Sequence, residues 1–208
     1  MTISARIEKS LDGLVRNGQS TDGLLEAYSE PHRRYHTLDH IDDMLTSVAE
    51  MSAGYDLPSH KSLSLELAVW YHDFVYEVGS VDNEVDSAKI ALARTNRASV
   101  FDAIVRIATH DRPETFWGAC LLDADLKGLG SSPLEYLDNR DRVKAEYGPL
   151  LPYESWVRGR AAFLTSYLDR PFLFHTSWGA RFEAQARENM KEELSNLTGE
   201  CSDLRSFT

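Results

Sequence analysis

The chain carries, at residues 67–76, the stretch Leu67-Ala68-Val69-Trp70-Tyr71-His72-Asp73-Phe74-Val75-Tyr76. It is apolar except for the adjacent His72 and Asp73, and a run of this kind is typical of an element buried on most sides. A carboxylate in such a place loses its water, which costs several kcal/mol unless the group is paired or bound to a cation. The adjacent His and Asp therefore indicate a metal ion, and other ligand-type residues are expected to point at the same place.

The bulk composition is that of a globular protein with a real core, since 42% of the 208 residues are hydrophobic. No stretch reaches the roughly 18 apolar residues of a membrane span, and the first ten residues lack the layout of a signal peptide. Cys120 and Cys201 form no pattern and are expected to be reduced thiols, so we expect a cytoplasmic protein without a membrane partner.

The formal net charge of −11 bears on the kind of partner. A binder of duplex nucleic acid needs a basic face to neutralise phosphates, so the charge argues against that function. A small anionic substrate remains compatible with it, provided that a cation and local arginines overcome the negative field.

Helical spacing recurs throughout, and no sustained period-two alternation indicates a strand. We predict an all-α protein: one bundle of about eight to ten helices in a single domain over residues 1–199, with a flexible tail at residues 200–208. The buried helix of the opening stretch is expected over residues 63–76.

The clearest helix start is Ser132-Pro133-Leu134-Glu135, which combines a cap, a proline at the first helical position and a glutamate at the third. The last helix is expected to end at Gly199, with Glu183 and Arg187 spaced for an ion pair.

Four places put metal-ligand side chains into or beside apolar helices. They are His36/His40, His72-Asp73, His110 and Asp123/Asp125. Imidazole and carboxylate together suit a divalent ion such as Mn, Fe, Mg, Zn or Co.

The helix expected after Thr37 allows a choice between its two histidines. At 100° per residue its apolar side chains cover an arc of about 140°. His40 lies at the edge of this arc, whereas His36 lies further round and precedes the cap. Because an edge residue can face a site while its helix stays anchored, we predict His40 as the ligand and His36 as a neighbour of the ion or the substrate. His72 and Asp73 can share an ion only if it lies between them.

The ordered set resembles the HD superfamily of predicted metal-dependent phosphohydrolases, over about residues 31–175. The segments that carry the resemblance are Arg34-Tyr35-His36-Thr37-Leu38-Asp39-His40-Ile41, Trp70-Tyr71-His72-Asp73-Phe74-Val75-Tyr76, Asp82-Asn83-Glu84 with Ser87-Ala88, Leu122-Asp123-Ala124-Asp125-Leu126, and Tyr153 with Gly159-Arg160. The resemblance implies an HD-type helical bundle with one set of metal ligands, namely His40, His72, Asp73 and Asp125. Asp125 is preferred to Asp123 because Ala124-Asp125-Leu126 has the residue order found around the family ligand.

The resemblance also implies hydrolysis of a small phosphorylated metabolite or nucleotide by a metal-activated water. A carboxylate could accept the proton of that water, and arginines, including Arg33 and Arg158, could hold the phosphate. The catalytic candidates are Glu84, Glu77 and His110, and the substrate-binding candidates are Arg34, Tyr35, His36, Tyr76, Asn83, Lys127 and Arg160. Tyr76 and Glu77 replace the Glu-Asp pair of the alarmone-hydrolysing branch, which argues against guanosine tetraphosphate as the substrate.

Other interpretations stay open at this stage. His72-Asp73 could be a buried structural pair, His110 a residue favoured by a helix C-terminus, Glu84 a first-turn acid and Arg160 half of a buried ion pair. A di-iron HD oxygenase would need more ligands, for which His36 and His110 are the spare histidines. A non-catalytic HD module could bind a nucleotide or a partner protein, and an apolar face on the first or last helix could support a homodimer.

Overall fold

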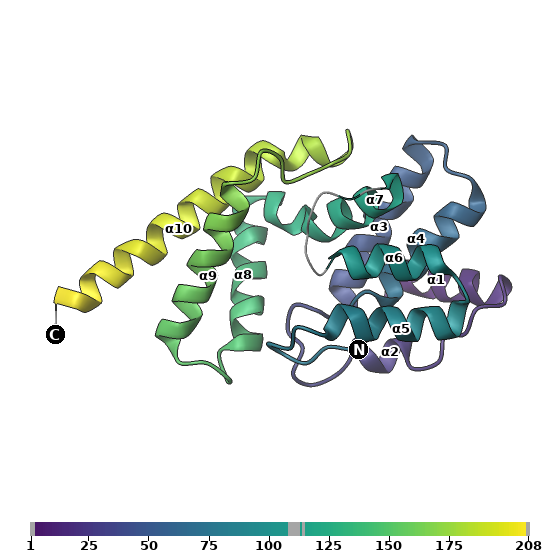
Figure 1. Ribbon diagram of the computed structural model, residues 1–208, viewed down its shortest axis with the longest axis horizontal. Coiled ribbons are helices and arrows are strands. Elements are labelled where there is room, and N and C mark those ends of the chain that lie inside the picture. Colours follow the sequence, from purple (N-terminus) through teal and green to yellow (C-terminus); the bar gives the residue numbers. More distant parts are fainter. Residues whose placement is uncertain (1–2, 108–112, 114, 207–208) are drawn as a thin grey trace. The chain divides into compact units, whose positions relative to one another are not determined.

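The computed structural model describes residues 3–107, 113 and 115–206, with side chains as far as residue 197 (Figure 1). Every regular element in these ranges is helical, and they contain no strand, which confirms the prediction of an all-α protein. None of the described helices is long and apolar enough to cross a membrane. The chain divides into two compact units, Met1–Asp125 and Leu126–Thr208, while the single domain over residues 1–199 stays a prediction.

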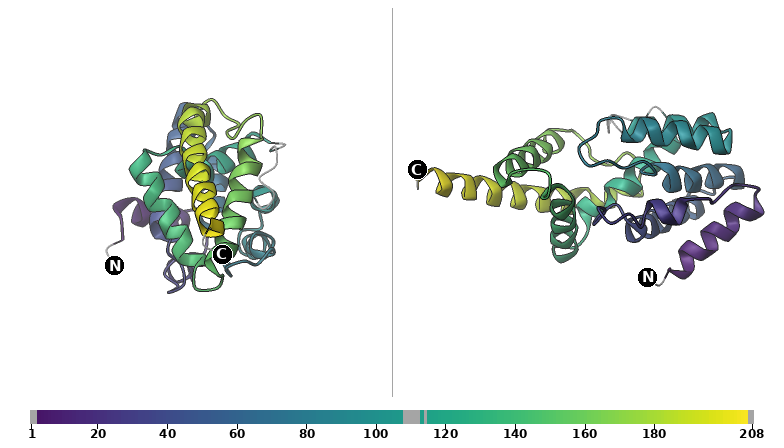
Figure 2. Two further views of the ribbon diagram at one scale, coloured as in Figure 1. Left: turned by 90° about the vertical axis from the view of Figure 1, so that its left-hand side faces the viewer. Right: turned by 90° about the horizontal axis from the view of Figure 1, so that it is seen from below.

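The first unit is built around one central helix. Its elements are α1 (Ala5–Arg16), α2 (Leu24–Ala27), α3 (Leu38–Gly54), α4 (Ser59–Tyr71), α5 (Asn83–Thr95), α6 (Ala98–Ile107) and α7 (Phe116–Leu126). Helix α4 contacts α1, α3, α5 and α6, and Figure 2 shows α3 and α4 between α1 and the α5–α6 pair. All five side chains of residues 67–71 are buried, which explains why this stretch is apolar on every face.

Helix α3 buries the predicted apolar stripe against α1 and α4. Ile41, Met44 and Met51 are fully buried, and Thr37 occupies the N-cap position, where its carbonyl accepts the Ile41 N–H at 3.2 Å. The stripe anchors the helix, and His40 is held buried at its edge.

Helix α4 ends at Tyr71, whereas the apolar pattern predicted a helix as far as Tyr76. The last carbonyls of a helix have no helical partners and need donors from elsewhere. The buried Tyr28 supplies one of them: its hydroxyl donates to the Trp70 carbonyl at 3.0 Å. Because burial raises the pKa of Tyr28 well above its usual value, the phenol stays protonated and keeps this role.

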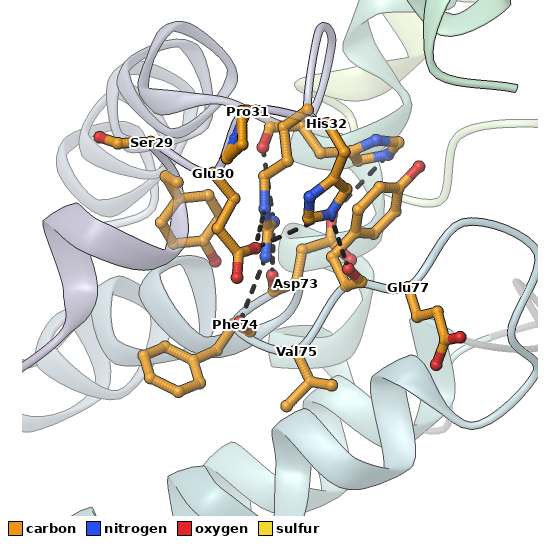
Figure 3. A network of polar contacts seen from close by, with 12 residues as sticks. Ser29, Glu30, Pro31, His32, Asp73, Phe74, Val75 and Glu77 are labelled. Carbon is orange, nitrogen blue, oxygen red and sulfur yellow. Dashed lines mark hydrogen bonds and ion pairs between the residues drawn. The ribbon is translucent and has the colours of Figure 1, made fainter. Parts of the chain in front are cut away.

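The exit segment (residues 72–77) leaves α4 without helical structure, and the loop of residues 28–37 supplies its donors (Figure 3). Arg33 donates to the carbonyls of Asp73 at 2.8 Å and Phe74 at 3.2 Å. His32 Nε2 lies 2.9 Å from the Tyr76 carbonyl, which can only accept. These bonds replace the helical ladder, so the chain can leave the helix while it is still in the core.

Helix α5 holds the same segment from a different element. The Ser87 hydroxyl accepts the Val75 N–H at 2.9 Å. The Asn83 amide accepts the Glu77 N–H and donates to the Glu77 carbonyl, both at 2.9 Å. Asn83 and Ser87 are four residues apart, on one face of α5, so the two side chains clamp one strip of backbone.

The second unit contains η1 (Lys127–Gly130), α8 (Pro133–Tyr147), α9 (Tyr153–Leu168), η2 (Gly179–Phe182) and α10 (Glu183–Ser206). The predicted capping box is confirmed, since Glu135 accepts the Ser132 N–H at 3.1 Å. The predicted pair is confirmed as well, with Arg187 Nε 2.7 Å from Glu183 Oε1. Helix α10 continues to Ser206, so the expected end at Gly199 is wrong. A single glycine costs a helix only about 1 kcal/mol and does not have to end it.

Replacing Ser87 by Ala should destabilise the protein by about 1–3 kcal/mol, because the Val75 N–H loses its acceptor inside the fold. Ser52→Ala is the matched control: the Ser52 hydroxyl is buried and has no hydrogen-bond partner among the described residues, so its removal should be neutral or slightly stabilising. Urea unfolding of both variants measures the difference. Equal stability of the two would contradict the clamp.

Candidate metal centre

Three elements of the first unit bring the four predicted ligands together. His40 comes from α3, His72 and Asp73 follow α4, and Asp125 lies near the end of α7. His72 Nε2 is 3.0 Å from Asp73 Oδ2 and 3.9 Å from Asp125 Oδ1. His40 Nε2 is 3.3 Å from the same Asp125 oxygen. These four side chains form the ligand cluster, and its carboxylate and imidazole atoms face one another.

The Nε2 atoms of both histidines in the cluster are buried and face carboxylate oxygens. His40 Nε2 has no hydrogen bond among the described residues, and His72 Nε2 has the carboxylate of Asp73 beside it. His72 Nδ1 is 2.8 Å from the Val69 carbonyl. A carbonyl can only accept, so Nδ1 carries the hydrogen, and in neutral His72 the lone pair lies on Nε2. Metal-binding histidines are oriented by an outer hydrogen bond of this kind.

Three side chains of the cluster could hold one metal ion, since ligand atoms of His40, His72 and Asp73 all lie within 4.8 Å of one another. Bonds from nitrogen or oxygen to Zn²⁺ are about 2.0–2.2 Å, so these atoms would move closer to one another around an ion. The contribution of Asp125 would then come from its oxygen beside His40.

The charges of the cluster are strongly coupled. Burial lowers the pKa of His72, but the negative charges of Asp73 and Asp125 outweigh it and raise the pKa to about 9. Burial raises the pKa of Asp73, but the neighbouring His72 and His36 outweigh it and hold this pKa far below its usual range. Without a metal, the cluster therefore keeps an imidazolium beside a carboxylate, and a divalent cation would take the place of that proton.

Three predicted substrate residues border the cluster. His36 Nε2 lies 3.8 Å from Asp73 Oδ2, and the ring of Tyr76 packs 4.4 Å from the His36 ring. The Tyr35 ring centroid is 5.0 Å from those of His36 and His40. The structure thus places His36 beside Asp73, with aromatic rings on its flanks.

Of the predicted acids, Glu84 lies next to Asn83 at the start of α5, and Glu77 lies in the segment before this helix. Glu77 is exposed, and Figure 3 shows its carboxylate pointing away from Asp73. Asn83 is buried, and its amide bonds the backbone of Glu77, which gives it a structural role. Glu84 is half-buried in the first turn of α5 and stays the better candidate for a base.

The predicted cations are distributed over both units. Arg34 is exposed in the first unit and donates to the Pro31 carbonyl at 2.6 Å. Lys127 and Arg160 belong to the second unit. Arg160 Nε lies 2.9 Å from Glu193 Oε1, inside the unit, and Tyr136 donates to the same carboxylate. This arrangement is the buried ion pair that the sequence left as an alternative.

The third predicted catalytic residue, His110, lies outside the described residues.

The choice between the two aspartates of α7 is supported by their positions. Asp125 faces His40 and His72, whereas Asp123 is completely buried two residues earlier, about 200° round the helix.

Sequence reasoning missed the role of Arg33, which bonds backbone carbonyls although its residue type suggested phosphate binding. No local pattern could have revealed that role, because its partners lie about 40 residues away.

Comparisons of the chain with protein-family models, with curated proteins and with solved structures found no match. The candidate metal centre therefore rests on its own geometry.

In metal-free protein, the stability should fall as the pH rises from about 6.5 to about 9. The folded-state pKa of His72, about 9, exceeds the unfolded value of about 6.5. The imidazolium thus stabilises the fold fully below pH 6.5 and loses this effect as it deprotonates, with a slope of at most about 1.4 kcal/mol per pH unit. Chemical unfolding of chelator-treated protein over this range measures the slope.

The Asp73→Asn variant should flatten this slope, because it removes the largest charge that raises the pKa of His72. Asp12→Asn, at an exposed position of α1, is the charge-matched control and should leave the slope as it is. A wild-type slope in Asp73→Asn would contradict the assignment to this pair.

Proposed function

We propose that this protein is a metal-dependent phosphohydrolase of the HD type, which acts on a small phosphorylated metabolite or nucleotide. The proposed metal ligands are His40, His72, Asp73 and Asp125. The observation that carries the proposal is the convergence of these groups: the buried Nε2 atoms of His40 and His72 face the carboxylates of Asp125 and Asp73, at 3.3 Å and 3.0 Å.

A purely structural interpretation explains only part of the cluster. It accounts for His72 and Asp73, which lie 3.0 Å apart as an ion pair. It leaves His40 Nε2 buried without a hydrogen bond among the described residues, which costs about 1–3 kcal/mol. A divalent ion satisfies both nitrogens at once and also neutralises the two buried carboxylates, so it accounts for all four side chains.

Hydrolysis follows from the chemistry of such a centre together with the resemblance to the HD superfamily. A protein shell of three or four ligands leaves room at the ion for water and a substrate oxygen. The bound ion would lower the pKa of that water and polarise the phosphoryl group. It would also attract an anionic substrate to a chain with a net charge of −11.

The surrounding residues would divide the remaining tasks. Glu84 would accept a proton from the attacking water, directly or through a second water. His36 would donate to the substrate beside Asp73, between the rings of Tyr35 and Tyr76. Arg34 is the predicted phosphate-binding cation in the same unit.

Two rival proposals share the ligand cluster. A di-iron oxygenase would need a second ion, for which His36 and Asp73, 3.8 Å apart, are a possible starting pair. A non-catalytic HD module would bind a nucleotide or a partner protein without turnover. Iron content with oxygen uptake would favour the first, and metal-free protein after purification without chelators would favour the second.

The deciding experiment is elemental analysis of protein purified without chelators, followed by a phosphatase screen with Mn²⁺, Mg²⁺, Co²⁺ and Fe²⁺ over nucleotides and sugar phosphates. Bound metal and metal-dependent release of phosphate would support the proposal. Retention of full metal content and activity by Asp73→Ala would overturn it.

Asp125→Asn should weaken metal binding by more than about 100-fold, because even the loss of an outer partner of a ligand costs about 10- to 100-fold. Asp123→Asn is the matched control on the same helix and should keep the metal affinity, although it can lower the stability of this buried position. Calorimetric titration with Mn²⁺ compares the two. Equal affinities would transfer the ligand role away from Asp125.

Glu84→Gln should keep metal binding and lower kcat by about 10²- to 10⁴-fold, the usual contribution of a general base. Asp86→Asn makes the same charge change in the same helical turn, where Asp86 pairs with Lys89 at the surface, and should leave kcat within about twofold. Steady-state kinetics on the substrate found in the screen measures both. Unchanged turnover in Glu84→Gln would exclude it as the base.

A further inference from the structure

We infer that Arg33 is a positioning residue for the metal centre, which joins the loop that carries His36 to the backbone that carries Asp73. This inference rests on the proposed function, since it concerns the geometry of the same ligands. Arg33 would contact neither the ion nor the substrate.

The donors of Arg33 are directed at the protein. Its side chain is completely buried, and Nε lies 2.9 Å from Glu30 Oε2. Nη1 donates to the Asp73 carbonyl at 2.8 Å and, more weakly, to the His36 carbonyl at 3.4 Å. Nη2 donates to the Phe74 carbonyl at 3.2 Å. In Figure 3, dashed lines join this loop to the labelled Asp73 and Phe74 of the exit segment.

Two aromatic rings fix the guanidinium in this place. Its central carbon lies 5.1 Å from the Tyr28 ring centroid and 5.0 Å from that of Tyr76. Cation–π contacts are stronger when the cation is desolvated, as it is here. Tyr28 belongs to the loop and Tyr76 to the exit segment, so the rings also connect the two segments.

The consequence for Asp73 is direct. Helix α4 has ended at Tyr71, so the Asp73 carbonyl has no helical donor beyond it and is held by Arg33. The direction of the Asp73 side chain follows from this backbone. Its Oδ2 atom reaches His72 Nε2 at 3.0 Å and His36 Nε2 at 3.8 Å. Loss of the carbonyl bonds would free the backbone and move a ligand atom.

A phosphate-binding role for Arg33 does not fit this arrangement, because the guanidinium is buried and its hydrogen bonds go to one carboxylate and three carbonyls. Lysine is not an adequate substitute. It keeps the charge but lacks the planar fork that reaches several acceptors at once. Arg33→Lys is therefore the informative variant.

The experiment compares Co²⁺ binding by three full-length proteins: wild type, Arg33→Lys and Arg187→Lys. Arg187 is the matched control, because in the second unit its guanidinium also bonds one carboxylate and two carbonyls, those of Leu168 and Arg170. Co²⁺ is titrated into metal-free protein well below the unfolding temperature of each variant. The visible absorption spectrum reports the coordination geometry, and the titration gives the affinity.

We expect Arg33→Lys to weaken Co²⁺ binding by about 10- to 100-fold and to change the spectrum, whereas Arg187→Lys keeps both. Both variants can lose stability, so thermal unfolding alone does not distinguish the roles. If Arg33→Lys does not fold, Glu30→Ala replaces it: Glu30 is half-exposed, and the loss of its carboxylate releases one anchor of Arg33. Weaker Co²⁺ binding by Glu30→Ala would support the inference.

Wild-type affinity and spectrum in Arg33→Lys, or in Glu30→Ala where that variant replaces it, would overturn the positioning role while leaving the proposed function in place. Absence of Co²⁺ binding by the wild-type protein would instead overturn the proposed function, and this inference with it.

Discussion

The carbonyl groups that follow Tyr71 need hydrogen-bond donors, and the first unit is arranged to supply them. Helix α4 ends inside the core, where water cannot satisfy its last carbonyls. Tyr28, His32 and Arg33 supply donors from the loop before α3, and Ser87 and Asn83 hold the following backbone from α5. The chain can therefore leave the helix immediately after its most apolar turns.

This helix end is also what creates the candidate site. A helix that continued to Tyr76 would direct His72 and Asp73 about 100° apart round its axis. Because it ends, the Asp73 carboxylate can approach His72 Nε2 at 3.0 Å, and His40 and Asp125 close the cluster. The hydrogen bond from His72 to Val69 fixes the ring so that Nε2 faces the carboxylates. The hydrogen bonds that hold the backbone after α4 therefore also hold the proposed metal ligands His72 and Asp73 in place.

Much of the helical framework could be predicted, because helical spacing and end signals are local. The stripe of α3 identified His40 as the edge residue, whereas the preference for Asp125 over Asp123 came from the resemblance to the HD superfamily. The end of α4 could not be predicted, since the run remains apolar to Tyr76 and its donors are distant in sequence. Arginines were the least predictable residues: Arg33 and Arg160 carry the charge that a phosphate needs, yet each is buried against a carboxylate of the protein. Residue type gives the charge, whereas only packing decides what that charge contacts.

By itself, the sequence determined an all-α chain and the residue types of a candidate metal centre, because periodicity and ligand chemistry are properties of short segments. Only the tertiary structure decided where α4 stops, which nitrogen of His72 faces the carboxylates, and that Asn83, Arg33 and Arg160 bond the protein itself. The physical reason is the same in each case. A buried polar group must find its partner wherever the fold brings one, and in this chain those partners mostly come from other elements.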